Sequence, residues 1–316
     1  IENIDATELN DVIFGDDKNN TIRAGAGNDV VNARAGDDVI DAGDGDDTVY
    51  AGSGNDLIIG GRGHDEIFAG AGDDNIVQTV HEEKDKIDGG DGFDIVDYSL
   101  IESAQAHRVG EALTKSDGIV ANLQGHSVIK YMSTANGQAI YAQDTLNNVE
   151  GIVATMQDDT LRGDHQDNLL DGAGGDDLIQ GRQGNDRLKG GQGNDTYEFS
   201  SGDGQDTIEE DGGKDKVKLL SITNANQVTV HKEQNNLVIR FTNEGVENSD
   251  TITVLGHFSS EKQAIEEIVL GNNVSYDVSA LIQAAAGPSA TQTPNSWSFN
   301  LNALTPLPPT LFTPIS

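Results

Sequence analysis

The stretch that decides the fold is residues 24–77, which reads AGAGNDVVN, ARAGDDVID, AGDGDDTVY, AGSGNDLII, GGRGHDEIF and AGAGDDNIV in successive nine-residue units. The fourth place of every unit is Gly, the sixth is Asp and the eighth is Val or Ile. The preceding unit, 15–23, keeps this frame but places Lys18 and Asn20 at its fourth and sixth places. A fixed short period predicts a fold in which each unit buries its apolar side chain by stacking on its neighbours.

The repeat continues beyond this stretch with two shifts of frame. Gln78 and Thr79 displace the frame by two residues, and two further units follow at 80–88 and 89–97. A second array, 154–198, is displaced in the same way and is also closed by two further units. The sequence therefore contains two arrays built on one plan.

The two arrays also align residue by residue. Residues 1–29 match residues 149–177 without a gap, at an offset of 149 − 1 = 148. Asn20 corresponds to Asn168, so that even the exception to Asp at the sixth place is copied. The chain thus opens partway through a unit, and we expect further protein before Ile1.

Two consecutive units are predicted to form one flat coil with a turn at each edge. The first six places form the turn, where Gly permits positive φ angles, and the last three form a short strand whose middle residue faces inward. Turns on the same edge are then 18 residues apart. One edge stacks Asn20, Asp38, Asp56 and Asp74, and the other stacks Asp29, Asp47 and Asp65.

Stacked carboxylates of this kind require a cation. At a coil spacing of ~4.8 Å, two carboxylates repel each other by about 3 kcal/mol at an effective dielectric constant near 20. A divalent cation that takes carboxylate oxygens and turn carbonyls has six or more oxygen ligands, which favours Ca²⁺ over Mg²⁺. The pattern lacks the His or Cys that zinc and copper prefer. Because the interior is one file of aliphatic residues, we expect the chain to fold only when calcium is bound.

Composition excludes several other classes of protein. The formal charge is 19 − 54 = −35, which argues against nucleic acids and anionic membranes as partners. There is no Cys, so disulfides cannot stabilise the fold, and no apolar run is long enough for a membrane helix. An acidic disordered linker is the alternative, but disorder does not require an aliphatic residue at every ninth place.

The repeats resemble those of the repeats-in-toxin (RTX) family, the hemolysin-type calcium-binding proteins. The resemblance is carried by residues 60–65, 89–99 and 190–208, and residues 250–286 resemble the domain that often follows such arrays. It implies a bacterial protein that leaves the cell unfolded by type I secretion and folds in extracellular calcium. The implied partners are calcium ions and the type I secretion machinery, and the implied location is extracellular or at the bacterial surface.

The resemblance also implies which residues bind calcium, namely the sixth-place residues and backbone carbonyls of the first four places. Carried over to this sequence, the candidate ligands are Asn20, Gly25, Gly27, Asp29, Gly36, Asp38, Gly43, Gly45, Asp47, Gly52, Gly54, Asp56, Gly61, Gly63, Asp65, Gly70, Gly72, Asp74, Gly90, Gly92, Asp94, Asp159, Asn168, Gly175, Asp177, Gly184, Asp186, Gly191, Gly193, Asp195, Gly202, Gly204 and Asp206. Weaker or missing sites are expected beside Asn20 and Asn168, which lack a charge, beside Arg34, which replaces a Gly, and at 80–84, which has no Gly.

The expected architecture is all-β. Two parallel β-roll arrays, 1–97 and 149–218, are separated by 98–148, which we interpret as a lid or a small β domain. A β-rich cap at 219–286 follows, and a Pro-rich uncharged tail occupies 287–316.

The cap and the tail each have a recognisable pattern. Strands are expected at 228–230, 237–241 and 250–255, and a short helix at 261–268. After Asp277 there is no charged residue, and all six prolines lie in the tail. The tail is interpreted as a flexible linker, a type I secretion signal or a docking peptide for a partner.

No catalytic motif is found. His81-Glu82-Glu83 lacks the second His of a zinc protease, Asp44-Gly45-Asp46 lacks the later Glu of an EF-hand loop, and there is no G-x-S-x-G sequence. We therefore expect these residues not to form an enzyme.

The leading interpretation is a calcium-folded structural and secretion region of a larger extracellular toxin or adhesin. One alternative is a module that binds polysaccharide or cell surfaces through a flat face with outward residues Asn32, Asp41, Tyr50 and Gln180. Another is an accessory region of a secreted protease, lipase or epimerase.

Overall fold

The computed structural model describes residues 3–79, 84–101, 113–134, 139–242, 250–260, 264–280, 296–303 and 306–307. The chain divides into two units, of which the first comprises 1–164 and 168–175 and the second comprises 165–167 and 176–316. Within each unit the strands belong to two sheets, and the predicted all-β fold with parallel β-roll arrays is confirmed. In the part of the chain that the structure describes, no helix is long and apolar enough to cross a membrane.

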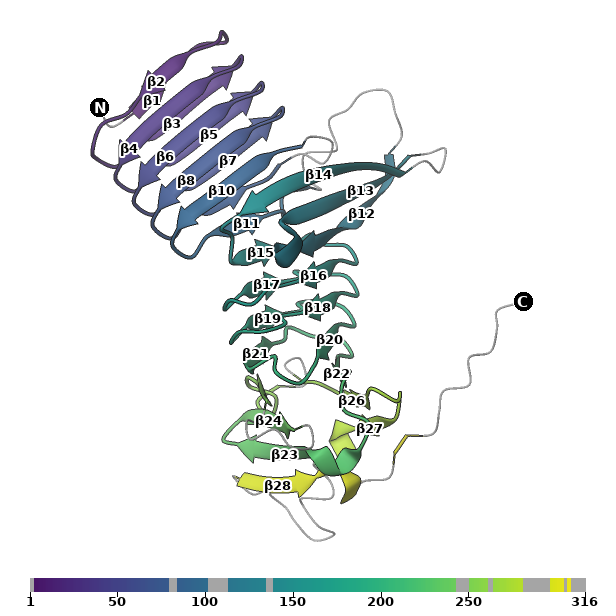
Figure 1. The fold of residues 1–316 in the computed structure, drawn as a ribbon. Coiled ribbons are helices and arrows are strands. Elements are labelled where there is room, and N and C mark those ends of the chain that lie inside the picture. The colour runs from purple at the N-terminus through teal and green to yellow at the C-terminus, as the bar shows by residue number, and fades with distance from the viewer. Residues whose placement is uncertain are drawn as a thin grey trace. The chain divides into compact units, whose positions relative to one another are not determined.

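In the first unit, successive strands of the repeats alternate between two sheets (Figure 1). The first sheet contains β1 (Asn3–Asp5), β3 (Thr21–Ala26), β5 (Val39–Asp44), β7 (Leu57–Arg62), β9 (Asn75–Val77), β11 (Ile95–Asp97), β15 (Gly151–Val153) and β17 (Leu169–Asp171). The second contains β2 (Val12–Phe14), β4 (Val30–Ala35), β6 (Thr48–Ser53), β8 (Glu66–Ala71), β10 (Lys86–Asp91), β14 (Ala139–Asn147), β13 (Ser127–Thr134), β12 (Leu113–Asn122) and β16 (Thr160–Arg162).

Most strands of the first array are longer than predicted. They run through the last three places of one unit and the first three of the next, so that β3 pairs with β5 at Ile22↔Ile40 and again at Gly25↔Gly43. The prediction of a three-residue strand is therefore wrong here, although it holds for β16 and β17 in the second array. The difference in strand length follows from the first place of the units, which is mostly Ala in the first array and mostly Gly in the second. Glycine weakens a strand interior, so the strands of the second array end earlier.

The longer strands widen the core. Side chains two residues apart in a strand point to the same face, so Ala24 at the first place lies beside Ile22 at the eighth, and both are fully buried. The same holds along the array for Ala33, Ala42, Ala51 and Ala69. The prediction of a single file of aliphatic residues is wrong for this array, because a second file of alanines packs alongside it.

The described part of 98–148 supplies three strands of the second sheet of the first unit. Strand β14 pairs in parallel with β10, β12 pairs in parallel with β16, and β13 joins the two in antiparallel fashion. A 3-10 turn, η2 (Leu123–Gly125), connects β12 to β13. The segment interpreted as a lid or a small β domain therefore continues the sheet of the roll.

The second unit contains the remaining strands. Its first sheet comprises β19 (Arg187–Lys189), β21 (Gln205–Glu209), β25 (Asp250–Val254), β24 (Asn236–Phe241), β23 (Val228–Glu233) and β28 (Ser296–Asn300). Its second sheet comprises β18 (Leu178–Gln180), β20 (Thr196–Phe199), β22 (Lys216–Leu219), β26 (Glu267–Leu270) and β27 (Ser275–Asp277). Two 3-10 turns, η3 (Ala225–Gln227) and η5 (Leu301–Ala303), accompany them.

The structure both confirms and corrects the predictions for the cap. The three predicted strands are confirmed as the antiparallel strands β23, β24 and β25. The predicted helix at 261–268 is wrong, because Glu267 and Ile268 begin β26, where Ile268 pairs with Tyr276 of β27; residues 261–263 lie outside the described residues. The pairing with β22 and β27 overrides the local helical preference of this charged stretch.

Part of the tail is ordered in the sheet of the cap. Strand β28 pairs antiparallel with β23, bringing Phe299 opposite Val230 and Trp297 opposite Lys232. Leu301 is fully buried beyond it. The interpretation as a flexible linker is therefore wrong for 296–303, where alternating aromatic residues form an edge strand.

Candidate calcium-binding turns

The sixth-place residues form two buried ladders along the edges of the first array. The backbone N–H of Asp29 donates to Oδ1 of Asp47 at 2.7 Å, and that of Asp47 donates to Oδ1 of Asp65 at 2.9 Å. On the other edge Asp38 donates to Asp56 at 2.7 Å. These bonds link residues 18 apart and confirm the predicted stacking.

All predicted sixth-place residues are buried, namely Asn20, Asp29, Asp38, Asp47, Asp56, Asp65, Asp74, Asp94, Asp159, Asn168, Asp177, Asp186, Asp195 and Asp206.

The ladders continue across the frame shifts. The N–H of Asp65 donates to Oδ1 of Asp85 at 3.1 Å, across 20 residues, and that of Asp186 donates to Oδ1 of Asp206 at 2.9 Å, also across 20. The two extra residues are therefore accommodated between coils while the ladder keeps its register. Asp85 thus belongs to the ladder, although it was not among the candidate ligands.

The second oxygen of these carboxylates is what marks the turns as cation sites. In the described part of the chain, a buried Oδ2 without a hydrogen-bond partner occurs in Asp29, Asp38, Asp47, Asp56, Asp74, Asp94 and Asp215. A buried carboxylate oxygen that receives no donor is costly, so it indicates a ligand bound from outside the protein. Carboxylate and carbonyl oxygens are hard donors, and the residues present fit Ca²⁺.

The electrostatics of the turns agree with this. Burial, together with the neighbouring Asp29 carboxylate, raises the pKa of Asp47 to about 7. Burial likewise raises the pKa of Asp74 to about 7 and of Asp206 to about 8. Without a cation, these turns hold protons close to neutral pH, because the folded coil disfavours their charged form.

The glycines of the turns bring the carbonyls of successive coils together. At Gly43, where φ is 103°, an added Cβ would overlap the carbonyl oxygen of Gly25 in the preceding coil. Positive φ angles occur at every candidate glycine, namely Gly25, Gly27, Gly36, Gly43, Gly45, Gly52, Gly54, Gly61, Gly63, Gly70, Gly72, Gly90, Gly92, Gly175, Gly184, Gly191, Gly193, Gly202 and Gly204. Arg34 stands where its neighbouring units have Gly and adopts a similar φ of 83°. This backbone conformation is strained for a residue with a side chain.

Comparison with known proteins agrees with this geometry. The family model of the RTX calcium-binding nonapeptide repeat matches four stretches, 5–40, 41–76, 152–179 and 171–208. Both arrays are RTX calcium-binding nonapeptide repeats. Among solved structures, the extracellular lipase LipA from Serratia marcescens is similar at 19% identity and a TM-score of 0.22, covering 80% of this chain and 40% of the lipase. The chain thus spans less than half the length of that lipase, and no curated protein matches it.

The first turns of the RTX arrays are closed by protein donors. Oδ2 of Asp11 accepts bonds from the N–H and the hydroxyl of Thr7 at 2.9 and 2.7 Å. At the offset of 148, Oδ2 of Asp159 accepts the same two bonds from Thr155 at 2.9 and 3.0 Å. Oδ2 of Asp159 therefore already accepts two bonds from Thr155, whereas a cation site would need this oxygen. The candidate ligand Asp159 instead forms the hydrogen-bonded start of its row.

The two exceptional asparagines also act within their own turns. Oδ1 of Asn20 accepts the N–H of Asp16 at 2.8 Å, and Oδ1 of Asn168 accepts the N–H of Asp164 at 2.8 Å. The copied Asn therefore shapes the first turn of its edge in both RTX arrays. The other expected weak region, 80–84, lies outside the described residues except for Lys84.

A second, exposed ladder runs in the opposite direction at the fifth places of the RTX units. The N–H of Asp46 donates back to Oδ1 of Asn28 at 3.2 Å, and the N–H of Asn28 donates back to Oδ1 of Asn10 at 3.0 Å. Sequence reasoning missed this ladder, although its signal was present, since the fifth place is Asn or Asp in most units.

In the first unit, one buried row ends on residues of the inserted strands. The N–H of Asp85 donates to Oδ1 of Asp144 at 3.1 Å, and the hydroxyl of Tyr98 donates to Oδ2 of Asp144 at 2.9 Å. Nζ of the fully buried Lys130 lies 2.9 Å from Oδ1 of Asp144 and 3.9 Å from Oδ2 of Asp85. A lysine ammonium therefore provides the positive charge at this end of the row.

Longer acidic side chains end two other rows. The N–H of Asp94 donates to Oε2 of Glu150 at 2.9 Å, and the N–H of Asp215 donates to Oε2 of Glu266 at 2.7 Å. Each Glu occupies the position of the next sixth-place Asp. Neither was predicted, because both glutamates lie outside the nine-residue frame.

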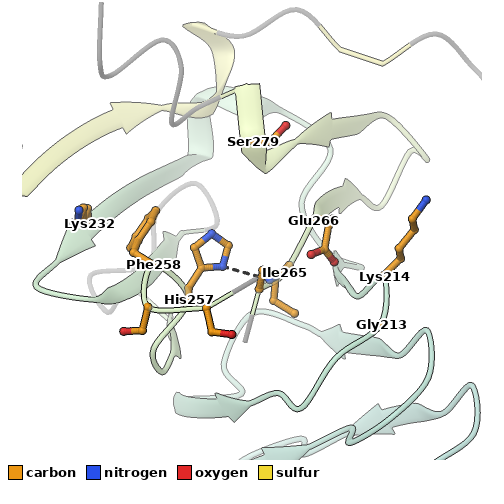
Figure 2. Close-up of a pocket in the computed structure, with 11 residues that line it drawn as sticks. Gly213, Lys214, Lys232, His257, Phe258, Ile265, Glu266 and Ser279 are labelled. Atoms are coloured by element: carbon orange, nitrogen blue, oxygen red, sulfur yellow. Dashed lines mark hydrogen bonds between the residues drawn. The ribbon is translucent and has the colours of Figure 1, made fainter. Parts of the chain in front are cut away.

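The second unit also has a pocket of about 710 Å³, which is lined by residues of the closing repeat unit, such as Lys214, and of the cap, such as His257 (Figure 2). Nδ1 of its buried His257 accepts the N–H of Ile265 at 3.1 Å, and burial lowers the pKa of His257 to about 4. Nζ of Lys232 lies 4.8 Å from the ring centre of Phe258, which packs edge-on against Trp297. The neutral imidazole is thus held by backbone and aromatic contacts, which give it a structural role.

Proposed function

We propose that this chain is a calcium-folded module that takes up its structure after secretion and forms a structural region of a larger extracellular protein. The observation that carries the proposal is the row of buried aspartate oxygens without protein partners, such as Oδ2 of Asp47 and Asp56. Bound calcium supplies the positive charge between adjacent turns. The chain itself supplies the carboxylates, the carbonyls of the glycine turns and the thin apolar interior.

The link between calcium and folding follows from these contributions. Buried carboxylates with raised pKa values, such as Asp74, oppose the metal-free coil near neutral pH. Metal binding energy therefore becomes folding energy. Extracellular calcium modules typically have Kd values of ~10⁻⁴–10⁻³ M, so such a module stays unfolded in a calcium-poor cytosol and folds outside.

In this proposal the unfolded chain leaves a bacterial cell through the type I secretion machinery. The uncharged composition after Asp277 supports a signal in the tail. Strand β28 forms only in the folded cap, so the same residues are available to the machinery before folding and to the cap afterwards. A variant in which Trp297 and Phe299 become Ser tests both roles, since we expect it to weaken the cap in the purified protein and to reduce export in cells, and the two effects are measured separately.

Calcium titration followed by far-ultraviolet circular dichroism tests the main proposal, with magnesium as the matched control ion. We expect a largely unfolded chain in EDTA, cooperative gain of β structure in calcium and little gain in equal magnesium. A chain that is already fully β-structured in EDTA overturns the proposal.

A second candidate function is binding to a polysaccharide or a cell surface. It is favoured by the exposed pair Tyr50 and Phe68, on the outward face of β6 and β8, whose rings stack at 5.0 Å between centroids. Exposed aromatic residues are enriched where proteins bind partners. A glycan array in millimolar calcium tests it, with the double variant Tyr50→Ser and Phe68→Ser as control; binding that survives this variant excludes the face.

The module itself is assigned no catalytic role. If the larger protein is an enzyme, the proposal places its active site outside this chain. Hydrolysis by the purified calcium-bound chain of protein, lipid ester or polysaccharide substrates would contradict this assignment.

A further inference from the structure

The closing unit of the second array departs from the repeat at its first place. In this unit Asp215 holds the sixth place, and Glu210 stands where most other units have Gly or Ala. Glu210 is 2% exposed, and a carboxylate oxygen of Glu210, of Asp195 and of Asp215 all lie within 4.8 Å of one another. This turn therefore brings together three carboxylates, whereas the repeat supplies two.

Protein donors hold one oxygen of each of the two closing carboxylates. The N–H of Asp195 donates to Oδ1 of Asp215 at 2.8 Å, and the hydroxyl of Tyr197 donates to Oε1 of Glu210. The N–H of Asp215 is engaged by Glu266 at 2.7 Å, which fixes the backbone of the turn. The cluster is thus positioned before any ligand binds.

The other oxygens point to a ligand. Oε2 of Glu210 and Oδ2 of Asp215 are both buried and have no hydrogen-bond partner among the described residues. Two buried, unpartnered carboxylate oxygens in one cluster repel each other and lack solvation, so the arrangement calls for a cation. All donors are carboxylate oxygens, which a hard divalent cation prefers over the nitrogen and sulfur ligands of zinc.

The unit one coil earlier on the same edge, 190–198, could not form such a site. At Gly190, which holds its first place, an added Cβ would overlap Oδ2 of Asp195. The intervening unit, 201–209, has Ser201 at its first place, and only the closing unit carries an acidic residue there.

We propose that Asp195, Glu210 and Asp215 form a three-carboxylate calcium site that is the tightest site of the second array and fills first. Ligand charge is one of the properties by which calcium sites tune affinity, so a third carboxylate gives a lower Kd than the two-carboxylate turns. The inference rests on the proposed calcium-dependent folding and goes further by naming the site at which binding begins.

The test compares calcium binding by the full chain and two matched variants, using isothermal titration calorimetry. Glu210→Gln removes the third charge, and Asp211→Asn removes the charge of the next residue, which is exposed and paired with Lys189 at 3.4 Å. We expect Glu210→Gln to weaken the tightest calcium-binding phase by roughly tenfold or more and Asp211→Asn to leave it unchanged. Equal isotherms for the two variants overturn this inference while the proposed function stands, whereas a wild-type chain that binds no calcium overturns the proposed function.

A second measurement does not depend on the folding of Glu210→Gln. Terbium ions take calcium sites and luminesce when an excited tyrosine lies close by. We expect the first equivalent of Tb³⁺ to give emission through Tyr197, to be lost in Tyr197→Phe and to persist in Tyr98→Phe, whose hydroxyl bonds Asp144 beside Lys130. First-equivalent emission that survives Tyr197→Phe overturns the inference.

Discussion

The backbone N–H of Asp29 donates a 2.7 Å hydrogen bond to Oδ1 of Asp47, while Oδ2 of Asp47 has no partner among the described residues. Each such aspartate divides its two oxygens between the preceding coil and a cation. The first bond sets the register of the coils, and under the proposed function the second oxygen makes their stacking depend on calcium. Replacing the carboxylate by an amide separates these contributions.

Asp47→Asn is expected to keep the bond to Asp29 through its amide oxygen and to lose a calcium ligand. We expect weaker calcium binding at the turns on both sides and a loss of about 1–3 kcal/mol in the free energy of unfolding in saturating calcium. Asp41→Asn is the control, since it removes the same charge from the outward ninth place. Chemical denaturation measures both, and equal losses in the two variants would refute the role of Asp47.

Acidification is expected to promote folding of the metal-free chain. The folded-state pKa values of Asp47 and Asp74 are about 7, above their ordinary value of 3.8, so the folded coil binds more protons than the unfolded chain between these limits. Stability without metal therefore rises as pH falls from about 7 towards 4. Circular dichroism in EDTA across this range should show increasing β structure.

The same protons compete with calcium. Apparent calcium affinity is therefore expected to fall as pH drops below about 7, because Asp47 and Asp206 must lose their protons to bind the metal. Titrations at several pH values measure it. An affinity that is constant between pH 7.5 and 5 would show that these carboxylates are not ligands.

Arg34→Gly is expected to stabilise the first array. The φ of Arg34 is 83°, which costs a residue with a side chain about 1 kcal/mol or more and costs glycine little. The loss of the contact between Arg34 and the Phe14 ring, at 6.0 Å, offsets part of the gain. Thermal unfolding in saturating calcium measures the difference, and Arg23→Gly, within β3, should destabilise instead.

Lys130→Met is expected to destabilise the first unit by about 3–5 kcal/mol, because it leaves Asp144 buried without its cation. Lys189→Met, which breaks a more exposed ion pair with Asp211, should cost about 1 kcal/mol or less. Denaturant unfolding compares them. The double variant Lys130→Met and Asp144→Asn should recover part of the loss, and no recovery would show that the charge of Asp144 is not the cause.

The nine-residue period was enough to predict the parallel coils, the edges on which Asp38 and Asp47 stack, and the continuation past the frame shift. It could not show whether a strand ends at the second-place glycine, so the inward file of alanines was missed. The Thr7 and Thr155 caps could have been found from the offset of 148 that revealed the duplication.

Residues that lie outside the nine-residue pattern could not be predicted from the period. Lys130 and Asp144 reach the ladder only because β12, β13 and β14 enter the sheet, and no periodic signal marks them. The helix expected at 261–268 failed because local charge pattern says nothing about pairing with β22. Glu210 was not predicted, because the repeat pattern assigns side-chain ligands only to the sixth place of a unit.

The alternation of strands between two sheets restricts how the first array can change in length during evolution. Removing one nine-residue unit before Asp85 would leave Asp85 beside Lys130 and Asp144, but it would move the residues before the deletion to the opposite edge. The row that starts at Asp11 would then end at Glu150 and not at Asp144. Each row start therefore keeps its own row end only when units are gained or lost in pairs, which is in multiples of 18 residues.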